Sequence, residues 1–350
     1  MRPTMKSAIL AGAAALALGA ATPAFAQGAG PTSSGTASGF YMNAEFLYGQ
    51  LFGANLSGAT VYNQFSNNNI NTSEQQANWG PGFRIGGGFR TGSNWDMGMA
   101  LSFLQGNLQS QSGRSFDCCF NVYTPVGAGD FGAVSGNWQR WMFDVDAGYN
   151  TAFAPYLNVR WSAGLRYLNL RVQQNASGAD DPNVTTRNSS YNGSVRDSFT
   201  GIGPRFGADA TIRLGQMGNG PVSFIAGAGA SLLMGSQRVR YNANFFSRGS
   251  FSGTDSFSTS SNSVVPMLDA TMALRWETMM GRLPVAFTLG YRADVMMGVQ
   301  SNMGSSGGMS PNFVSAAAPV QAKGPSIGGG GGSNSNIGTQ TVYLGVGISF

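Results

Sequence analysis

The sequence contains no histidine, and charged residues make up only 10% of its 350 residues. Histidine is the side chain whose ordinary pKa lies closest to neutral pH, so general acid–base catalysis uses it more often than any other residue. Its absence argues against most hydrolase and acyltransferase mechanisms, and it also removes the commonest zinc ligand. We therefore expect no enzyme, with no catalytic, cofactor-binding or metal-binding residues and no cofactor.

Lysine is almost absent as well. Lys6 and Lys323 are the two lysines, and every other basic residue is an arginine. The formal net charge of +5 is a small excess of 20 basic over 15 acidic residues. No basic cluster of the kind that binds nucleic-acid phosphates is present. We therefore expect no nucleic-acid partner.

Cysteine is limited to Cys118 and Cys119. Because they are adjacent, they cannot join distant elements of the fold. One interpretation is a loop detail, with the two thiols either reduced or joined in a small strained ring. The other is a contact or redox point in an oxidising compartment.

Long hydrophobic runs are confined to the start of the chain. Arg2 and Lys6 precede an apolar stretch at residues 8–21, and Ala24-Phe25-Ala26 has the small-x-small pattern of a cleavage site. This pattern predicts a secretory signal peptide over residues 1–26. A membrane helix would need about 20 apolar residues, whereas Thr22-Pro23 ends this run.

After the signal, the longest apolar stretch covers residues 222–235, and it is short, glycine-rich and alternating. A helix of this kind could not cross a bilayer, so a membrane location requires strands. We expect a flexible N-terminal tail at residues 27–38 and one domain at residues 39–350.

The end of the chain shows the clearest pattern of strand alternation. Its apolar residues fall at every second position, while the residues between them are small or carry a hydroxyl group. The ending resembles the C-terminal assembly signal of bacterial outer-membrane barrels, in which the final strand pairs with the first. That resemblance implies an interaction with the barrel assembly machinery. The predicted signal residues are Val342, Leu344, Val346, Ile348 and Phe350.

The same alternation recurs in nine earlier segments, and the connections between segments are alternately long and short. Short turns on one side and long loops on the other are typical of an outer-membrane barrel. The pattern predicts an all-β, antiparallel, up-and-down transmembrane barrel of ten strands, or twelve if the loop at 105–137 hides a hairpin. The strands are expected at 40–48, 83–90, 95–103, 140–149, 157–167, 205–214, 222–232, 268–277, 285–295 and 342–350, and the long loops at 51–79, 105–137, 173–197, 235–262 and 297–338.

A soluble β-sandwich is the structural alternative, but its exposed faces normally carry both lysine and glutamate. Here the polar faces carry arginine, aspartate and glycine, which suits an enclosed lumen where arginine pairs with carboxylates. Eight arginines and eight acids fall on the polar phase, so we expect weak ion selectivity. The predicted pore-lining residues are Glu45, Arg84, Arg90, Asp96, Asp144, Asp146, Arg160, Arg166, Arg205, Asp209, Arg213, Asp269, Arg275, Glu277, Arg292 and Asp294.

Two hairpins resemble a known family. The run Trp141–Tyr149, followed after a turn by Arg160–Tyr167, resembles the central hairpin of the Legionella-type major outer-membrane protein family. Phe199–Gly207, followed by Ala230–Gly235, resembles the next hairpin of that family. The resemblance implies a pore-forming barrel in the outer membrane of a Gram-negative bacterium.

The sequence favours the first of two functions, and the second is the alternative. The first is a porin-like barrel for passive diffusion of small hydrophilic solutes. Ten strands give a backbone radius of roughly 10 Å, which inward side chains nearly fill, although inward glycines would leave gaps. The second is a non-conducting structural or adhesive barrel that acts through its external loops. Either would contact outer-membrane lipid and lipopolysaccharide, and a homo-oligomer such as a porin trimer is expected only by analogy.

Overall fold

The computed structural model describes residues 38–53, 56–63, 68–91, 93–114, 120–123, 128–129, 131–179, 189–247, 250–300 and 334–350. In this part of the chain, no helix is long and apolar enough to cross a membrane. The predicted signal peptide, nearly all of the predicted tail and the cysteine pair lie outside the described residues.

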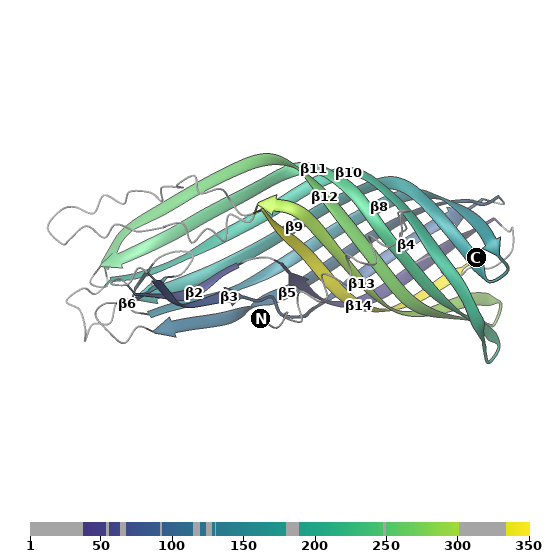
Figure 1. Cartoon of the computed structure of the whole chain (residues 1–350), viewed down its shortest axis with the longest axis horizontal. Helices are drawn as coiled ribbons and strands as arrows, with labels where there is room; N and C mark the ends of the chain where they lie inside the picture. Colours follow the sequence, from purple (N-terminus) through teal and green to yellow (C-terminus); the bar gives the residue numbers. More distant parts are fainter. Residues whose placement is uncertain are drawn as a thin grey trace.

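Ten strands of the described chain form one closed barrel, with each strand antiparallel to both neighbours (Figure 1). This confirms the predicted class and strand number. The strands are β1 (Gly39–Phe52), β4 (Gly80–Arg90), β5 (Trp95–Arg114), β8 (Phe131–Ala154), β9 (Leu157–Ala179), β10 (Ser189–Met217), β11 (Gly220–Ser247), β12 (Ser250–Met280), β13 (Leu283–Gln300) and β14 (Asn334–Ser349).

The first and last strands close the ring, as predicted. Met42 lies opposite Ile348 and Tyr48 opposite Val342. The amide of Phe350 donates to the carbonyl of Phe40 at 2.9 Å. Closure is required because an unpaired strand edge in lipid leaves backbone groups without partners, at a cost of several kcal/mol each.

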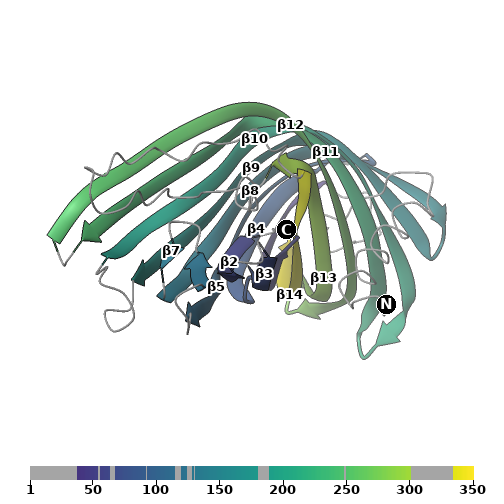
Figure 2. The same ribbon diagram turned by 60° about the vertical axis from the view of Figure 1, so that its left-hand side comes forward.

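Four of the predicted loops are wrong, because much of 51–79, 105–137, 173–197 and 235–262 is strand. The pairing of β11 with β12, for example, continues to the register of Ser247 with Ser250. In Figure 2, β8 to β12 extend well beyond β13 and β14 on the same side of the barrel. In the part of the chain that the structure describes, the barrel wall is therefore much taller on the side of β8 to β12.

A second, smaller sheet lies on the external side and has the order β3-β2-β6-β7. It consists of β2 (Leu56–Asn63), β3 (Asn68–Gln75), β6 (Phe120–Tyr123) and β7 (Ala128–Gly129). The predicted loop at 105–137, in which a hidden hairpin was considered, thus contributes β6, which pairs with β2 from the predicted loop at 51–79. It adds no strand to the barrel, which keeps ten.

A row of apolar outward side chains crosses four adjacent strands and divides the barrel in two. It consists of Tyr167, Ile202, Met234 and Val264, which are direct cross-strand partners in that order and are all exposed. We call this the boundary row. The side with the short turns is the membrane half, and the side beyond the row is the external half.

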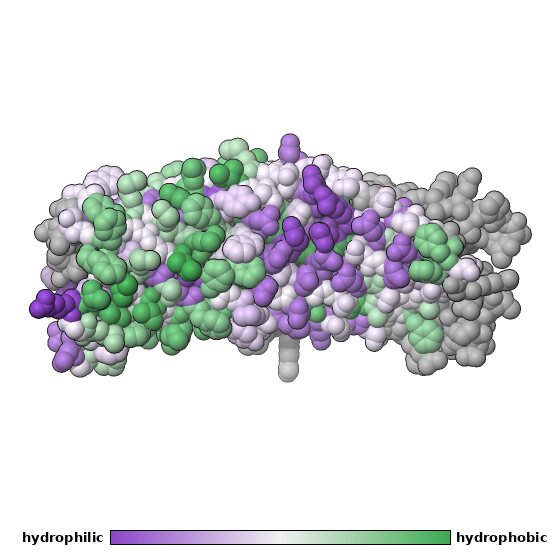
Figure 3. Space-filling model, turned by 180° about the vertical axis from the view of Figure 1, so that it is seen from behind, coloured by the Kyte–Doolittle hydropathy of each residue, from purple (hydrophilic) through white to green (hydrophobic). Residues whose placement is uncertain are grey.

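The two halves have opposite polarity. In the membrane half the large exposed side chains are apolar, for example Met97 and Leu165, as a lipid-facing surface requires. Figure 3 shows hydrophobic residues gathered over this half and hydrophilic residues beyond it. In the external half most of the buried inward residues are apolar, and Trp138, Leu168 and Val239 belong to one buried cluster.

Candidate functional site

The interior of the membrane half holds most of the predicted pore-lining charges. Arg90 and Glu277 are half-buried, whereas Arg213 is exposed near the end of β10. Arg213 pairs with Ser223, which in turn pairs with the buried Arg275, so its inward orientation stays a prediction. The register of β10 shifts between Arg213 and Gly215, next to the short turn. The buried members are Glu45, Arg84, Asp96, Asp144, Asp146, Arg160, Arg166, Arg205, Asp209, Asp269, Arg275, Arg292 and Asp294.

Arg166 joins two carboxylates from different strands. Its Nε lies 2.7 Å from Asp144 on β8, and its Nη1 lies 2.5 Å from Asp269 on β12. Strands β9 and β12 are three places apart in the ring, so the second contact reaches across the lumen. Breaking such a buried pair is costly because it leaves an uncompensated charge away from water.

Arg160 makes a similar cluster closer to the short turns. It contacts Asp96 on β5 and Asp146 on β8, with N–O distances of 2.5 and 2.7 Å. The guanidinium occupies the space that a side chain at Gly148 would need. The inward glycine therefore makes room for an arginine instead of leaving a gap.

A third cluster surrounds Glu45 on β1. Arg84 on the neighbouring β4 and Arg292 on β13 approach it at 3.2 and 3.4 Å. Arg292 also donates to the hydroxyl of Thr271 at 3.2 Å and lies over the ring of Tyr343. Tyr343 in turn fills the space beside Gly290. Here again the glycine accommodates a neighbouring side chain.

Arg205 connects the first two clusters. Its guanidinium lies 3.5 Å from Asp269 and 3.8 Å from Asp146. Acidic groups from β8 and β12 and arginines from β9 and β10 thus form one continuous network. Among the described side chains, no three acidic or thiol groups converge as a metal site would require.

Arg140 is the network member that the sequence prediction omitted. Its Nη1 donates to both carboxylate oxygens of Asp294, at 2.8 and 2.6 Å, and to the hydroxyl of Thr339. It lies within the predicted strand at 140–149 and has the same phase as Asp144 and Asp146, but it was not included among the predicted pore-lining residues. The identity of its partner, 154 residues away, has no signal in the sequence.

The Arg140–Asp294 pair spans the lumen. Arg140 is on β8 and Asp294 is on β13, and in the ring of ten these strands are five places apart in either direction. One hydrogen-bonded ion pair therefore connects opposite walls of the barrel. At this level, inward side chains from six strands enclose a space of about 10 Å³, which is the room of about one water molecule.

An apolar layer lies immediately beyond this network, inside the external half. Trp138 and Leu168 are at most 1% exposed. Both belong to one cluster that also includes Ile337. The interior thus contains two successive layers, the first ionic and the second apolar.

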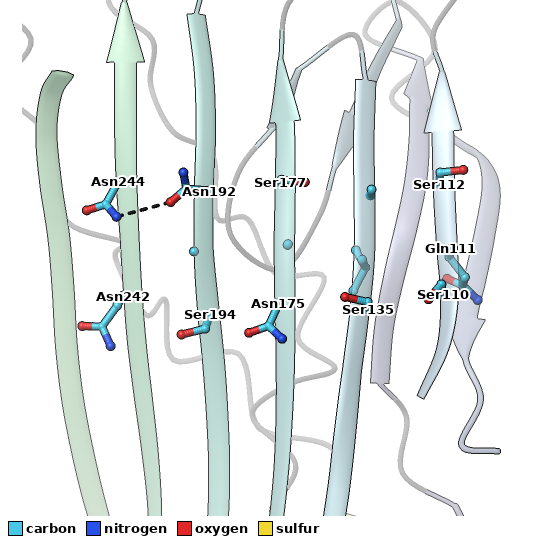
Figure 4. Close-up of a pocket in the computed structure, with 14 residues that line it drawn as sticks. Ser110, Gln111, Ser112, Ser135, Asn175, Ser177, Asn192, Ser194, Asn242 and Asn244 are labelled. Carbon is cyan, nitrogen blue, oxygen red and sulfur yellow. Dashed lines mark hydrogen bonds between the residues drawn. The ribbon is translucent and has the colours of Figure 1, made fainter. Parts of the chain in front are cut away.

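A shallow depression of about 690 Å³ lies on the wall of the external half, across β5, β8, β9, β10 and β11. Serine and asparagine make up most of its lining, and Figure 4 shows these side chains in rows on successive strands. Asn244 donates to Asn192 at 3.3 Å. The depression lacks the charged and aromatic groups that usually give a binding site its specificity.

Comparison with protein families matches residues 32–350 to the family described as the Legionella pneumophila major outer membrane protein precursor. The chain belongs to this family. The resemblance of its two hairpins is thereby confirmed, and the family places the chain in the bacterial outer membrane. A comparison with curated proteins found no match.

Solved structures similar to this family member are outer-membrane barrels with little sequence identity to it. The outer membrane protease OmpT from Escherichia coli is 10% identical, with a TM-score of 0.39 and coverage of 89% of this chain and 97% of that one. Ail from Yersinia pestis, the attachment invasion locus protein, is 11% identical, with a TM-score of 0.23 and coverage of 89% and 98%. A TodX monoaromatic hydrocarbon channel mutant is 7% identical, with a TM-score of 0.23 and coverage of 89% and 90%.

Proposed function

We propose that this protein is a closed outer-membrane barrel that does not conduct solutes through its lumen and acts through its external half. The observation that carries the proposal is the Arg140–Asp294 pair, which connects opposite walls of the ring. The sequence favoured the porin, whereas this geometry supports the alternative, the structural or adhesive barrel.

Burial of the lumenal charges supports the same conclusion. The lining of a water-filled channel would be accessible to water, whereas Arg166, Arg205 and Arg275 are at most 2% exposed. The space of about 10 Å³ enclosed at this level is far smaller than a hydrated solute. The apolar layer around Trp138 adds a second barrier, because apolar constrictions exclude water and ions.

The external half has the features expected of a rigid platform. Its wall is continuous strand on β8 to β12, and its inner face is packed with apolar side chains. A contact surface built on paired strands holds its shape better than one built on loops. A structural or adhesive role would use this outer surface.

Single-channel recording in planar bilayers tests the proposal directly. We expect purified protein to insert without discrete conductance steps. Steps in the wild-type protein, scaling with salt concentration, would overturn the proposal and support the porin interpretation.

Substitutions in the two layers test which side chains block the lumen. Arg140→Ser with Asp294→Ser removes the spanning pair without changing the net charge, and adding Trp138→Ala also thins the apolar layer. We expect the triple variant to conduct. The control is Arg275→Ser with Glu277→Ser, which removes an ion pair on a single strand, 3.8 Å apart, and should remain closed. Equal conductance in the control and the triple variant would contradict the assigned barrier.

A further inference from the structure

Four arginines lie on the outer face of the external half, just beyond the boundary row. Arg171 is on β9, Arg196 on β10, and Arg238 and Arg240 on β11. Each is in phase with the boundary residue of its strand, since Tyr167, Ile202 and Met234 are an even number of positions away. Arg171, Arg238 and Arg240 are exposed and Arg196 is half-buried.

The arginines adjoin one another across the sheet. Arg196 is the direct cross-strand partner of Arg240, while Ser198 lies between Arg171 and Arg238. Strands β9 and β11 are therefore about 10 Å apart at this row, at about 4.8 Å per strand. Gln173 accepts hydrogen bonds from Arg196 at 2.7 and 3.2 Å, which holds that guanidinium against the sheet.

Without a bound anion, repulsion between these arginines lowers the stability of the folded protein. Like charges directly opposite one another on a sheet repel, and the acidic residues of β9, β10 and β11, Asp197 and Asp209, are both buried on the inner face. None of the salt bridges found among the described residues neutralises any of the four arginines. The cluster thus presents concentrated positive charge that a bound anion would balance.

The depth of the cluster indicates which anion. The arginines begin four to six residues beyond the boundary row, which is roughly 10 to 15 Å along the membrane normal at about 3.3 Å per residue and a tilt of about 40°. Arginine side chains are long enough to bring the guanidinium back towards the lipid surface. The groups within reach of these side chains are the phosphates of the lipid headgroups and the first sugars attached to them.

We propose that Arg171, Arg196, Arg238 and Arg240 form a binding site for the phosphorylated headgroup of lipopolysaccharide in the outer leaflet. Guanidinium groups bind phosphate oxygens through paired, charge-assisted hydrogen bonds. One phosphate between Arg196 and Arg240 would relieve their repulsion, while Arg171 and Arg238 would contact a second anionic group. This site is independent of whether the lumen conducts.

The test measures binding of lipid A to the purified full-length barrel in detergent by native mass spectrometry. Three probes are compared, namely bisphosphorylated lipid A, dephosphorylated lipid A and inorganic phosphate as a competitor. The test variant is Arg238→Gln with Arg240→Gln. The matched control is Arg213→Gln with Arg282→Gln, which removes two exposed arginines from the short-turn side.

We expect the wild type to bind bisphosphorylated lipid A and to bind the dephosphorylated form much more weakly. The test variant should lose about 30-fold in affinity, at about tenfold per 1.4 kcal/mol and about 1 kcal/mol per arginine at an anionic surface, and the control should bind like wild type. Equal losses in both variants, equal binding of the two lipids, or displacement by millimolar phosphate would each overturn the proposal. The four-fold variant, with all four arginines replaced by glutamine, should be folded and lipid-free.

Discussion

The membrane half and the external half are built from the same strands in the same register, yet their interiors are chemically opposite. On the inner face of β9, Arg166 is 1% exposed within an ion network, and Leu168, the next inward residue, is 0% exposed within an apolar cluster. On the outer face the change is reversed, from Leu165 to Asn169. The polarity reverses at the boundary row without any break in the strand.

The reversal follows from the medium that surrounds each half. Lipid favours apolar outward side chains, so in the membrane half the polar residues turn inward, where they must satisfy one another. Water surrounds the external half, so its apolar residues turn inward as in a soluble protein. One strand can therefore cross from lipid into water if inward and outward positions keep alternating. Its apolar residues must face outward in the membrane half and inward in the external half.

The largest loss of stability is expected when a charged residue of the kind that lines the membrane half is placed inside the external half. Leu168→Asp would place a carboxyl group in the apolar cluster with no arginine assigned to it. We expect a loss of about 5 kcal/mol in the free energy of unfolding, because an unpaired buried charge is among the costliest substitutions. Urea unfolding in detergent, followed by tryptophan fluorescence, measures it.

Leu168→Ala separates the cost of charge from the cost of lost packing. Truncating a buried leucine should remove about 2 to 5 kcal/mol, so the aspartate variant should be the less stable of the two. If Leu168→Asp were as stable as Leu168→Ala, water would have access to this layer and the two interiors would not differ as described.

The converse change, Arg166→Met, should have a slightly smaller effect. It leaves Asp144 and Asp269 buried without their shared cation, which costs about 3 to 5 kcal/mol. Replacing all three residues together, with Asp144→Leu and Asp269→Leu, should recover part of that loss because the two carboxylates left without Arg166 are removed, while Arg205 loses Asp269 and keeps Asp146 at 3.8 Å. A triple variant no more stable than Arg166→Met would show that the arginine acts by filling space and not by pairing.

The fold of the membrane half could be predicted because each strand keeps one apolar outward face there. Alternation assigned Asp144, Arg160 and Arg166 to the inner face, and their burial agrees with that assignment. That these charges line a pore stays a prediction. The role of Val342 to Phe350 as an assembly signal likewise stays a prediction, although the strand they form closes the ring.

The external half was missed because its alternation has the opposite sense. Val239, Tyr241 and Ala243 alternate with polar residues within the predicted loop at 235–262, but they face inward, and a search for outward apolar residues does not detect them. The link from Arg140 to Asp294 could not be predicted either. Alternation gives the face of a residue but not its partner across a closed ring, and that partner decides whether the lumen is open.

The smallest of these effects concerns a carboxyl group on the inner face of the external half. Asp197 lies five residues beyond Ile202 of the boundary row, and it is 7% exposed. Gln237 donates to both of its oxygens, at 3.2 and 3.3 Å. No arginine is assigned to it, in contrast to the carboxylates of the membrane half. Burial raises the pKa of Asp197 from 3.8 to about 6.

Because the folded-state pKa is the higher one, the folded protein holds this proton more tightly than the unfolded chain. The contribution of Asp197 to stability is therefore complete below about pH 4 and is lost as the pH rises to about 6. Asp197→Asn should remove this pH dependence and stabilise the external half at pH 7.5 by at most about 3 kcal/mol. Hydrogen exchange of β10 and β11 at pH 5 and pH 7.5, corrected for intrinsic rates, measures the effect locally.

Gln237→Leu removes the two hydrogen bonds to Asp197 and should raise the pKa of Asp197 further, which widens the pH range over which stability changes. If wild type and Asp197→Asn showed the same pH dependence, Asp197 would be ionised at no cost, and the interior of the external half would be wetter than its apolar lining implies.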